Sequence, residues 1–447
     1  MIKIYDTMTR SLRDFVPLTE NVVNMYVCGP TVYNYIHIGN ARSAVAFDTI
    51  RRYFEYCGYT VNYISNFTDV DDKIIKAANE AGISTKELSD KFIAAFMEDT
   101  GQLGIKPATQ NPRVINYMDE IIAFVSTLVD KGFAYVSEGD VYFRVAKSNN
   151  YAKLANKTLE DLEIGASGRT DAETERKENP LDFALWKAAK EGEVSWNSPW
   201  GPGRPGWHIE CSVMATEILG DTIDIHGGGA DLEFPHHTNE IAQSEAKTGK
   251  TFANYWMHNG FVNVDNEKMS KSLGNFVTIH DMLQTVDGQV LRFFLATQQY
   301  RKPINFTEKA IHDAEVNLKY LKNTHSLPLT EQVNQAELQT YLDTFQEAMD
   351  DDFNTANGVT VLFDMAKWIN SGNYDQTVKD AFEKMLQVFG IVFEEEVLDE
   401  DIVKLIEERQ AARANKDFAT ADRIRDELAA QGIKLLDTKE GVRWTRD

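Results

Sequence analysis

Apolar residues follow two different periods along the first hundred positions. Short apolar runs at 24–27 and 61–64 are typical of buried strands, and the amphipathic stretch 41–56 between them is typical of a helix. This succession of strand, helix and strand predicts a doubly wound α/β domain with its ligand crevice at the carboxyl ends of the strands. The string Ser84-Thr85-Lys86-Glu87 predicts a capped helix whose apolar face carries Leu88, Phe92, Ile93 and Phe96.

A different pattern begins near residue 115. Apolar positions over 115–129 predict a helix ended by Gly132, and the residues 134–143 predict a hairpin that turns at Glu138-Gly139-Asp140. The polar stretch 147–180 predicts an irregular insert. We therefore expect an inserted connective domain that interrupts the α/β domain.

The α/β domain is expected to resume near Gly201. The string Asp224-Ile225-His226-Gly227-Gly228-Gly229 predicts a strand that ends in a glycine run. Gly227 and Gly228 either allow a nucleotide to approach the backbone closely or form a tight structural turn.

Beyond Thr307, a predicted N-cap, the period is almost wholly helical and predicts an all-α bundle. The acidic run from Glu394 to Asp401 predicts a solvated linker or a helix start. Two further helices and a terminal hairpin over 433–444 predict a small mixed α/β domain. The expected domains are the first half of the catalytic domain at 1–114, the connective domain at 115–200, the second catalytic half at 201–306, the helical bundle at 307–390 and the C-terminal domain at 391–447.

Composition limits the class of protein. The 447 residues include three cysteines, no apolar run near 18 residues and no N-terminal secretion pattern, so we expect a cytoplasmic protein with no membrane partner. Cys57, at a predicted helix end, is expected to pack in the interior. The net charge of −23 opposes binding to RNA, but residues 401–447 carry ten basic and ten acidic residues and are the least acidic place for RNA to approach.

Two short strings suit phosphate chemistry. In His37-Ile38-Gly39-Asn40, Gly39 allows a nucleotide to lie against a helix start, and His37 can donate to charge on phosphorus. In Lys268-Met269-Ser270-Lys271-Ser272, two lysines on a mobile loop suit a pyrophosphate leaving group. Taken alone, each string has a simpler interpretation. The first also occurs by chance in many chains, and the second is also typical of a solvated surface turn. Together and in this order they indicate an adenylate-forming ligase.

A third group of residues suits a metal ion. Cys28 ends an apolar run, Cys211 lies in a Trp-His-Ile-Glu-Cys string, and His236 and Glu240 lie four residues apart after a proline. On a helix these last two share a face while His237 points elsewhere. Two thiolates, an imidazole and a carboxylate form a zinc ligand set; the alternative is two ordinary buried cysteines and a polar helix start.

Longer strings resemble one family. The residues from Tyr26 to Gly39, 66–75, 203–212, 224–229 and 234–237 are similar to the cysteinyl-tRNA synthetases, which belong to the class I aminoacyl-tRNA synthetases. The resemblance runs along essentially the whole chain. It implies a Rossmann-like catalytic domain, followed by a helical bundle and a domain that recognises the anticodon. Asn40 stands where the family's motif ends in histidine, and asparagine donates a hydrogen bond but carries no proton charge.

The resemblance also implies substrates and roles. The substrates are cysteine, ATP with Mg²⁺ and the cysteine tRNA, and one zinc ion per chain selects the thiolate of cysteine over the hydroxyl of serine. We expect a monomer. The expected roles are catalysis and ATP binding by His37, Asn40, Lys268, Lys271, Gly39, Gly227 and Gly228; cysteine binding by Thr68, Trp207 and His226; zinc binding by Cys28, Cys211, His236 and Glu240; and anticodon binding by Arg413, Asp422, Asp437 and Trp444.

Two other functions stay open from the sequence. A ligase that joins cysteine to an amino sugar would use the same adenylation, but a small acceptor does not require the long region after about residue 390. A zinc hydrolase would need an open metal position, and it has no use for Lys268 and Lys271.

Overall fold

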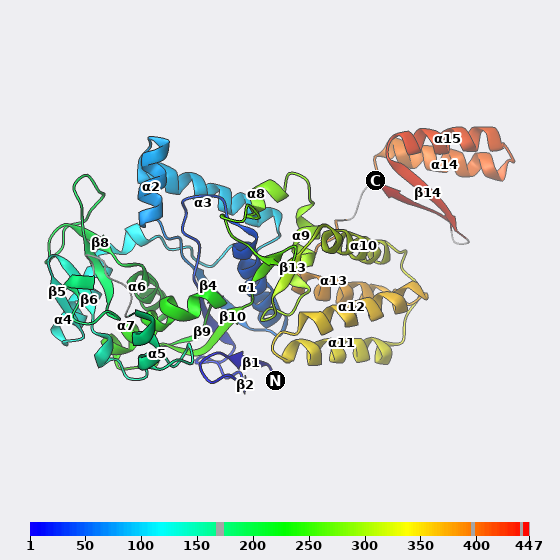
Figure 1. The fold of residues 1–447 in the computed structure, drawn as a ribbon. Coiled ribbons are helices and arrows are strands. Elements are labelled where there is room, and N and C mark those ends of the chain that lie inside the picture. Colours follow the sequence, from blue (N-terminus) through cyan, green and yellow to red (C-terminus); the bar gives the residue numbers. More distant parts are fainter. Residues whose placement is uncertain (167–173, 395–397, 439–440, 447) are drawn as a thin grey trace. The chain divides into compact units, whose positions relative to one another are not determined.

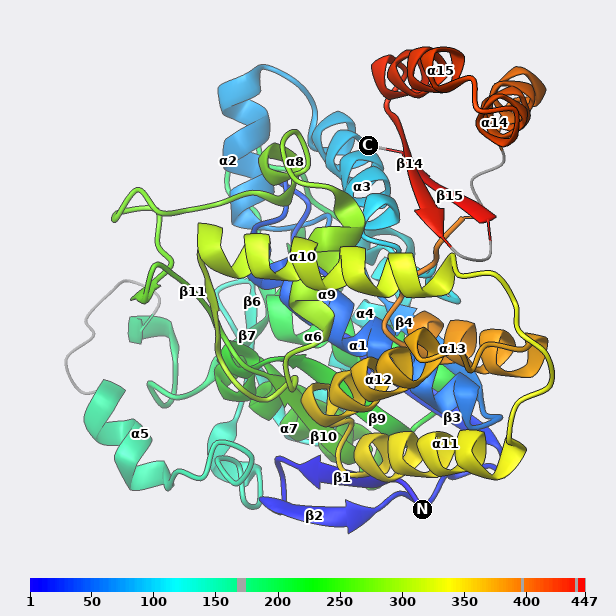
Figure 2. The same ribbon diagram turned by 90° about the vertical axis from the view of Figure 1, so that its right-hand side faces the viewer.

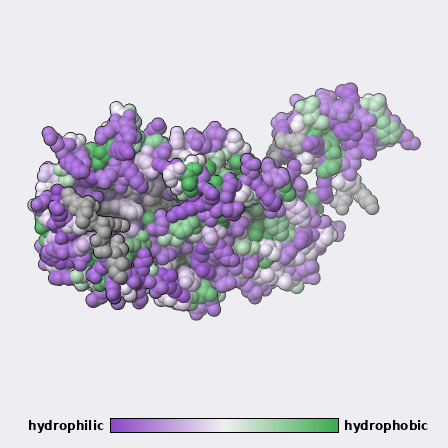
Figure 3. Space-filling model, viewed as in Figure 1, coloured by the Kyte–Doolittle hydropathy of each residue, from purple (hydrophilic) through white to green (hydrophobic). Residues whose placement is uncertain are grey.

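The computed structural model describes residues 1–166, 174–394, 398–438 and 441–446 (Figure 1). The chain forms two compact units, Met1–Val392 and Phe393–Asp447, which we describe separately. No helix among the described residues is long and apolar enough to span a membrane. Figure 3 shows a face of mainly hydrophilic residues, interrupted by apolar patches.

The centre of the first unit is a four-stranded parallel sheet in the order β10-β9-β3-β4. Its register places Met25 between Tyr63 and Ile225. Helix α1, Ile38–Tyr56, connects β3 to β4, so the predicted strand, helix, strand succession and the α/β fold class are confirmed. The strands are β3 (Val22–Val27), β4 (Thr60–Ser65), β9 (Ile223–Gly229) and β10 (Ala253–Asn259).

Helices α2 (Asp72–Ala81) and α3 (Thr85–Gln102) follow the first half of the sheet. The predicted cap of α3 is present, because the Ser84 hydroxyl accepts from the backbone of Glu87 and the Glu87 side chain accepts from the backbone of Ser84. The predicted apolar face of α3 packs on α2 in a small core of its own, which contains Ile74, Ala78, Leu88 and Phe92 with Ile93 and Phe96 against it.

The insert consists of α4 and a separate antiparallel sheet in the order β5-β6-β7-β8. The predicted hairpin is confirmed as β5 and β6. The sheet continues to Pro205, beyond the expected end of the insert at 200, because β8 pairs with β7 at Pro205 opposite Trp186. Part of the expected irregular stretch, 167–173, lies outside the described residues. The elements are η1 (Val114–Tyr117), α4 (Met118–Asp130), β5 (Ala134–Ser137), β6 (Asp140–Phe143), η2 (Val145–Lys147), α5 (Leu159–Ala166), η3 (Thr174–Arg176), β7 (Phe183–Ala188) and β8 (Gly203–Pro205).

The second half of the catalytic part returns to the central sheet. Helices α6 and α7 lie on either side of β9 in the sequence, and a small sheet β12-β11-β13 follows β10. A short hairpin, β1 and β2, begins the chain. The elements are β1 (Lys3–Asp6), β2 (Ser11–Asp14), α6 (Trp207–Leu219), η4 (Ala230–Leu232), η5 (Glu233–His237), α7 (Thr238–Thr248), β11 (Val262–Val264), β12 (Glu267–Lys268), α8 (Ile279–Met282), α9 (Gly288–Ala296) and β13 (Ile304–Phe306).

Four helices form the predicted bundle, and Thr307 caps the first of them (Figure 2). Its interior contains Phe345, Leu362, Met365 and Phe382, all fully buried. Figure 1 shows the central sheet between this bundle and the insert. The helices are α10 (Glu308–His325), α11 (Gln335–Asp350), α12 (Thr355–Asn370) and α13 (Gln376–Val388).

A buried arginine, Arg292, connects the last residues of the first unit to helix α1 of the catalytic part. Arg292 of α9 pairs with Asp48 of α1 at 2.7 Å and donates to the Phe389 carbonyl at 2.8 Å, just beyond α13. Gln289 exchanges hydrogen bonds of 2.9 and 3.3 Å with the backbone of Val392. The last residues of this unit are therefore held by the helices that carry the catalytic part.

The second unit contains two helices and the predicted terminal hairpin. A small core of Ile402, Ile424, Leu428 and Ile433 holds them together. The acidic run predicted as a linker falls partly on 395–397, outside the described residues. The elements are α14 (Glu400–Ala414), α15 (Phe418–Ala430), β14 (Ile433–Thr438) and β15 (Gly441–Arg446).

Candidate functional site

A cavity of about 680 Å³ opens beside β3 and β9. It brings together residues from all three candidate groups, although they are up to about 240 positions apart in the sequence. Parallel strands place their carboxyl ends at one edge of a sheet, which explains why these segments meet. Its lining includes Cys28, His37, Gly39, Asn40, Trp207, Gly229, Asp231, Lys268 and Lys271.

His37 and Asn40 form the cap of helix α1. The Asn40 backbone N–H donates to Nδ1 of His37 at 3.2 Å, and the His37 backbone N–H donates to the Asn40 side-chain carbonyl at 3.2 Å. Because Nδ1 accepts, the proton of the neutral imidazole lies on Nε2. Burial lowers the pKa of His37, although Asp231 opposes this effect, so the ring is neutral at pH 7.

Gly39 lines the cavity, as its predicted role requires, and the structure adds a second reason for a glycine there. A Cβ at this position would lie 2.9 Å from the imidazole of His37, so glycine is required for the ring to fold over the helix start. Gly227 likewise faces the ring of Phe47 from α1, which a Cβ would approach to 2.4 Å. Neither Gly227 nor Gly228 lines the cavity, whereas Gly229 does. Gly227 serves packing between α1 and β9, and Gly228 leaves room for the side chains of Leu232 and His237, so this placement does not support the predicted approach of a nucleotide to either glycine.

The lysine-containing string forms a loop after β12. Its shape is held by polar side chains, because Ser270 N–H donates to Asn275 at 2.8 Å and the Asn275 amide donates to the Lys268 carbonyl at 3.2 Å. The Lys271 ammonium lies 5.4 Å from the ring centroid of Tyr33 and 5.2 Å from that of Phe276. In the part of the chain that the structure describes, neither lysine pairs with a carboxylate, so both are available to a ligand.

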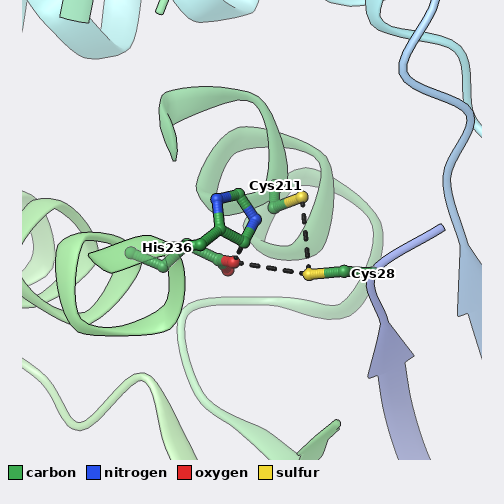
Figure 4. A group of neighbouring side chains, drawn as sticks. Cys28, Cys211 and His236 are labelled. Carbon is green, nitrogen blue, oxygen red and sulfur yellow. Dashed lines mark hydrogen bonds and ion pairs between the residues drawn. The ribbon is translucent and has the colours of Figure 1, made fainter. Parts of the chain in front are cut away.

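The four expected metal ligands come together at the end of β3 (Figure 4). Figure 4 shows Cys28, Cys211 of α6 and His236 with their side chains turned toward one another. The Cys28 and Cys211 sulfurs are 3.7 Å apart, and Cys28 Sγ lies 3.5 Å from Glu240 Oε1. A tetrahedral zinc ion with Zn–S near 2.3 Å and Zn–O near 2.0 Å requires about 3.8 Å and about 3.5 Å for these pairs. The group therefore fits zinc.

The electrostatics of this group also favour a cation. Burial opposes a charge on His236, but the carboxylate of Glu240 and the thiol of Cys211 raise its pKa to about 10. Burial likewise raises the pKa of Glu240, while His226 and His236 lower it to about 2. A buried carboxylate that is ionised beside two thiols attracts positive charge, and a bound metal ion would take the place of the proton.

His237 lies closer to the site than its sequence position indicated. Its Nε2 is 3.3 Å from Cys28 Sγ, and Cys28, His226, His237 and Glu240 form a second possible ligand set. The prediction that His237 points elsewhere was wrong, because His237 lies three positions before Glu240 in helical backbone that continues into α7, and residues three apart share a helix face as residues four apart do. The second set fits a tetrahedron less well, since His237 Nε2 lies 4.0 Å from Glu240 Oε1 where about 3.3 Å is needed.

Other histidines surround the ligands and were not found from the sequence. His208 contacts His236 at 3.0 Å between their Nδ1 atoms, and His258 contacts His237 at 2.8 Å and Thr7 at 2.7 Å. Such partners orient the ligands of a metal site. His208 follows Trp207 directly, and this position beside a candidate residue was the only signal for it in the sequence.

The three candidates for cysteine binding occupy different places. Trp207 lines the cavity, is 40% exposed and stacks on His236 with 4.1 Å between ring centroids. His226 is fully buried, contacts Glu240 at 2.6 Å and stacks on Trp256. Thr68 is also buried and accepts a hydrogen bond from Asn66. His226 and Thr68 are not among the residues that line the cavity, and their contact with the amino acid stays a prediction.

Within the second unit, most of the candidates for anticodon binding contact one another or the core. Asp437 accepts two hydrogen bonds of 2.9 Å from Arg409 and also pairs with Arg413. These contacts, with the bonds from Arg409 first, lower the pKa of Asp437 to about 2. Trp444 packs against the small core, and Asp422 pairs with Arg425 at 3.5 Å. Asp437 and Trp444 therefore help to hold this unit together.

Comparisons with known proteins identify the family of the chain. Three family models match successive parts of the chain: the tRNA synthetases class I (C) catalytic domain at 14–316, the DALR domain at 344–394 and the cysteinyl-tRNA ligase anticodon binding domain at 395–444. The cysteine–tRNA ligases of Streptococcus thermophilus (strain CNRZ 1066) and Streptococcus pyogenes serotype M6 are 95% and 83% identical to this chain over 447 residues, which is the full length of every chain.

Two solved structures are similar in fold. Mycobacterium tuberculosis methionyl-tRNA synthetase in complex with methionyl-adenylate has a TM-score of 0.60 and 16% identity, over 82% of this chain and 89% of that one. A putative arginyl-tRNA synthetase from Campylobacter jejuni has a TM-score of 0.52 and 15% identity, over 82% and 90% of the two chains.

Proposed function

The chain belongs to the class I cysteine–tRNA ligases, and from this we propose how its own side chains carry out the reaction. The enzyme joins cysteine to ATP, with release of pyrophosphate, and transfers the cysteinyl group to the cysteine tRNA. In the first step a carboxylate oxygen of cysteine attacks the α-phosphorus, and the bond to the bridging oxygen breaks. In the second step the terminal ribose hydroxyl attacks the carbonyl carbon, and AMP leaves. Positioning and electrostatics carry most of both steps.

The observation that carries the proposal is that a zinc-shaped ligand group reaches, through Cys28, the cavity that the two phosphate-binding strings line. Cys28, Cys211, His236 and Glu240 would hold the zinc ion. A zinc ion there would lower the pKa of a bound thiol and favour the thiolate of cysteine over the alcohol of serine. Trp207 covers His236 and closes the side of the pocket where the small side chain would lie.

The phosphate groups would lie between the two strings. His37, with its proton on Nε2, can donate to the α-phosphate, and the cap of α1 fixes the ring in that orientation. Lys268 and Lys271 line the same cavity, where they would neutralise the charge that develops on the pyrophosphate. Asn40 uses its carbonyl in the cap, so its amide group is the donor left for a ribose or phosphate oxygen.

The second unit would recognise the anticodon of the tRNA, as the name of its family model says. Of the four candidates there, Asp422 is the most exposed and suits a contact with RNA, while Arg413 is about as exposed as Asp437, with which it pairs. We further propose that the enzyme acts as a monomer in the cytoplasm, which suits its three free cysteines. No observation on the site favours the amino-sugar ligase or the hydrolase.

Exchange of labelled pyrophosphate into ATP tests this proposal. We expect exchange that requires cysteine, proceeds without tRNA and fails with serine, and the purified enzyme should contain about one zinc ion per chain. Exchange that serine supports as well as cysteine, or active enzyme without zinc, would refute the role of the metal. Transfer of cysteine to an amino sugar and not to tRNA would show that the acceptor is the amino sugar.

A further inference from the structure

A third lysine faces the cavity between the two phosphate-binding strings. Lys73, in the first turn of α2, lines the cavity that also contains His37 and Lys271. Its ammonium lies 5.5 Å from the ring centroid of Tyr33, and the ammonium of Lys271 lies 5.4 Å from the same centroid. The two charges are thus at most about 11 Å apart, close enough for one extended phosphate chain to reach both.

The acidic residues beside Lys73 are already engaged. The carboxylate of Asp71 accepts the Lys73 backbone N–H at 2.8 Å, and Asp72 pairs with Arg204 of β8. Among the residues that the structure describes, no carboxylate pairs with the Lys73 ammonium. Burial has the largest effect on the pKa of His37 and lowers it, and the charges of Lys271 and Lys73 lower it further. Both ammonium groups therefore lie close enough to act on the imidazole.

This concentration of positive charge stands out in a chain with a net charge of −23. Asp231 also lines the cavity and acts on His37, but its single carboxylate offsets only one of the two ammonium charges, which repel each other unless a further anion lies between them. The same cavity is the proposed site of ATP, whose leaving group gains negative charge when the bond to the α-phosphorus breaks. An anion with several negative charges at this place satisfies both lysines.

We propose that Lys73 binds the pyrophosphate portion of ATP together with Lys271 and stabilises it as it leaves. This inference rests on the proposed adenylation. The carboxylate of cysteine forms the new bond to the α-phosphorus, the bond from that phosphorus to the bridging oxygen breaks, and the electron pair stays on the pyrophosphate. No proton is transferred in this step, and Lys73 acts only through its fixed charge.

The test compares Lys73→Ala with Lys76→Ala in the full-length, zinc-loaded enzyme. Lys76 is on the same helix but lies outside the cavity and pairs with Glu80 at 4.0 Å. We expect Lys73→Ala to slow cysteine-dependent pyrophosphate exchange by about 10- to 100-fold and to raise the KM for pyrophosphate, with the KM for cysteine unchanged. Lys73→Arg should restore much of the rate, and Lys76→Ala should match the wild type.

Two results would overturn the inference. One is normal exchange in Lys73→Ala with slow transfer to tRNA, which would assign Lys73 to a phosphate of the tRNA end. The other is an equal effect of both alanine variants. Absence of cysteine-dependent exchange in the wild type would refute the proposed adenylation itself. Exchange that is present in the wild type and in Lys73→Ala but lost in Lys271→Ala would refute only the role of Lys73.

Discussion

His236 and His237 belong to two overlapping ligand sets that share Cys28 and Glu240, and their substitution decides which set holds the metal. We expect His236→Ala to lose zinc, because the set that contains His236 has the two sulfurs and the carboxylate at tetrahedral separations. We expect His237→Ala to keep it, since His237 Nε2 lies 4.0 Å from Glu240 Oε1, farther apart than two ligands of one tetrahedral zinc ion.

The size of the effect follows from the number of ligands. A four-ligand zinc site contributes about 10–16 kcal/mol, so one ligand accounts for about 3 kcal/mol, or about two orders of magnitude in affinity. His237 would act as a neighbour that orients the site through Cys28 and His258, and its loss should weaken binding only about tenfold. The two variants should therefore differ by at least about tenfold.

Zinc content after gel filtration, followed by competition with a chelator of known affinity, measures this difference. Cysteine- and serine-dependent exchange on the same samples shows whether selectivity is lost with the metal. Cys57→Ser is a suitable control, because this third cysteine is in neither ligand set. Retention of zinc in His236→Ala together with its loss in His237→Ala would refute our assignment and place the ion in the second set.

Three further predictions concern other parts of the chain. Lys271→Ala should slow exchange by about 10²- to 10³-fold with an unchanged KM for cysteine, since its charge acts in the transition state; a matching rise in that KM would contradict this. Truncation after Val392 should preserve pyrophosphate exchange and abolish tRNA charging. A cut after Val388 should also lower the stability of the first unit, because it removes the Phe389 carbonyl that Arg292 binds. Full tRNA charging by the chain that ends at Val392 would show that the second unit does not recognise the anticodon. Burial would raise the pKa of Asp48, but Arg292 and Arg52 hold this pKa below the ordinary value of a carboxyl group. The ionised Asp48 therefore stabilises the fold fully above the ordinary carboxyl pKa, and this stabilisation is lost as the pH falls through the lowered pKa of the folded protein. Asp48→Asn should therefore cost about 3 kcal/mol at neutral pH and less on acidification in denaturant titrations; a difference independent of pH would contradict this.

The sequence was informative where structure depends on neighbours along the chain. The cap of α3 and the strand, helix, strand core follow from residue spacing, and so both were predictable. The metal ligands could be proposed by residue type, since few other roles bring cysteines, a histidine and a glutamate into such strings. Their meeting across distant segments required the fold.

What the sequence could not indicate depends on contacts between elements. His237 enters the ligand group because Cys28, at the end of the sheet region, lies 3.3 Å from its Nε2, and this contact comes from a segment more than 200 positions away. Gly227 is needed because a ring from α1 lies against it, and no periodicity reveals which helix crosses a strand. Asp437 pairs with Arg409 and Arg413 of a helix that precedes it by more than 20 residues, so its charge looked available.

The position of Cys28 and Cys211 sets an order on folding. These two sulfurs meet across 183 positions, and the whole insert lies between them. Closing a flexible loop of that length costs about 4–5 kcal/mol of chain entropy, but an insert that has already folded brings its own ends together and removes most of that cost. His236 and Glu240 leave the ribosome later still, so more than half of the chain must be synthesised before the site can close. Metal uptake during refolding should consequently lag behind formation of the insert.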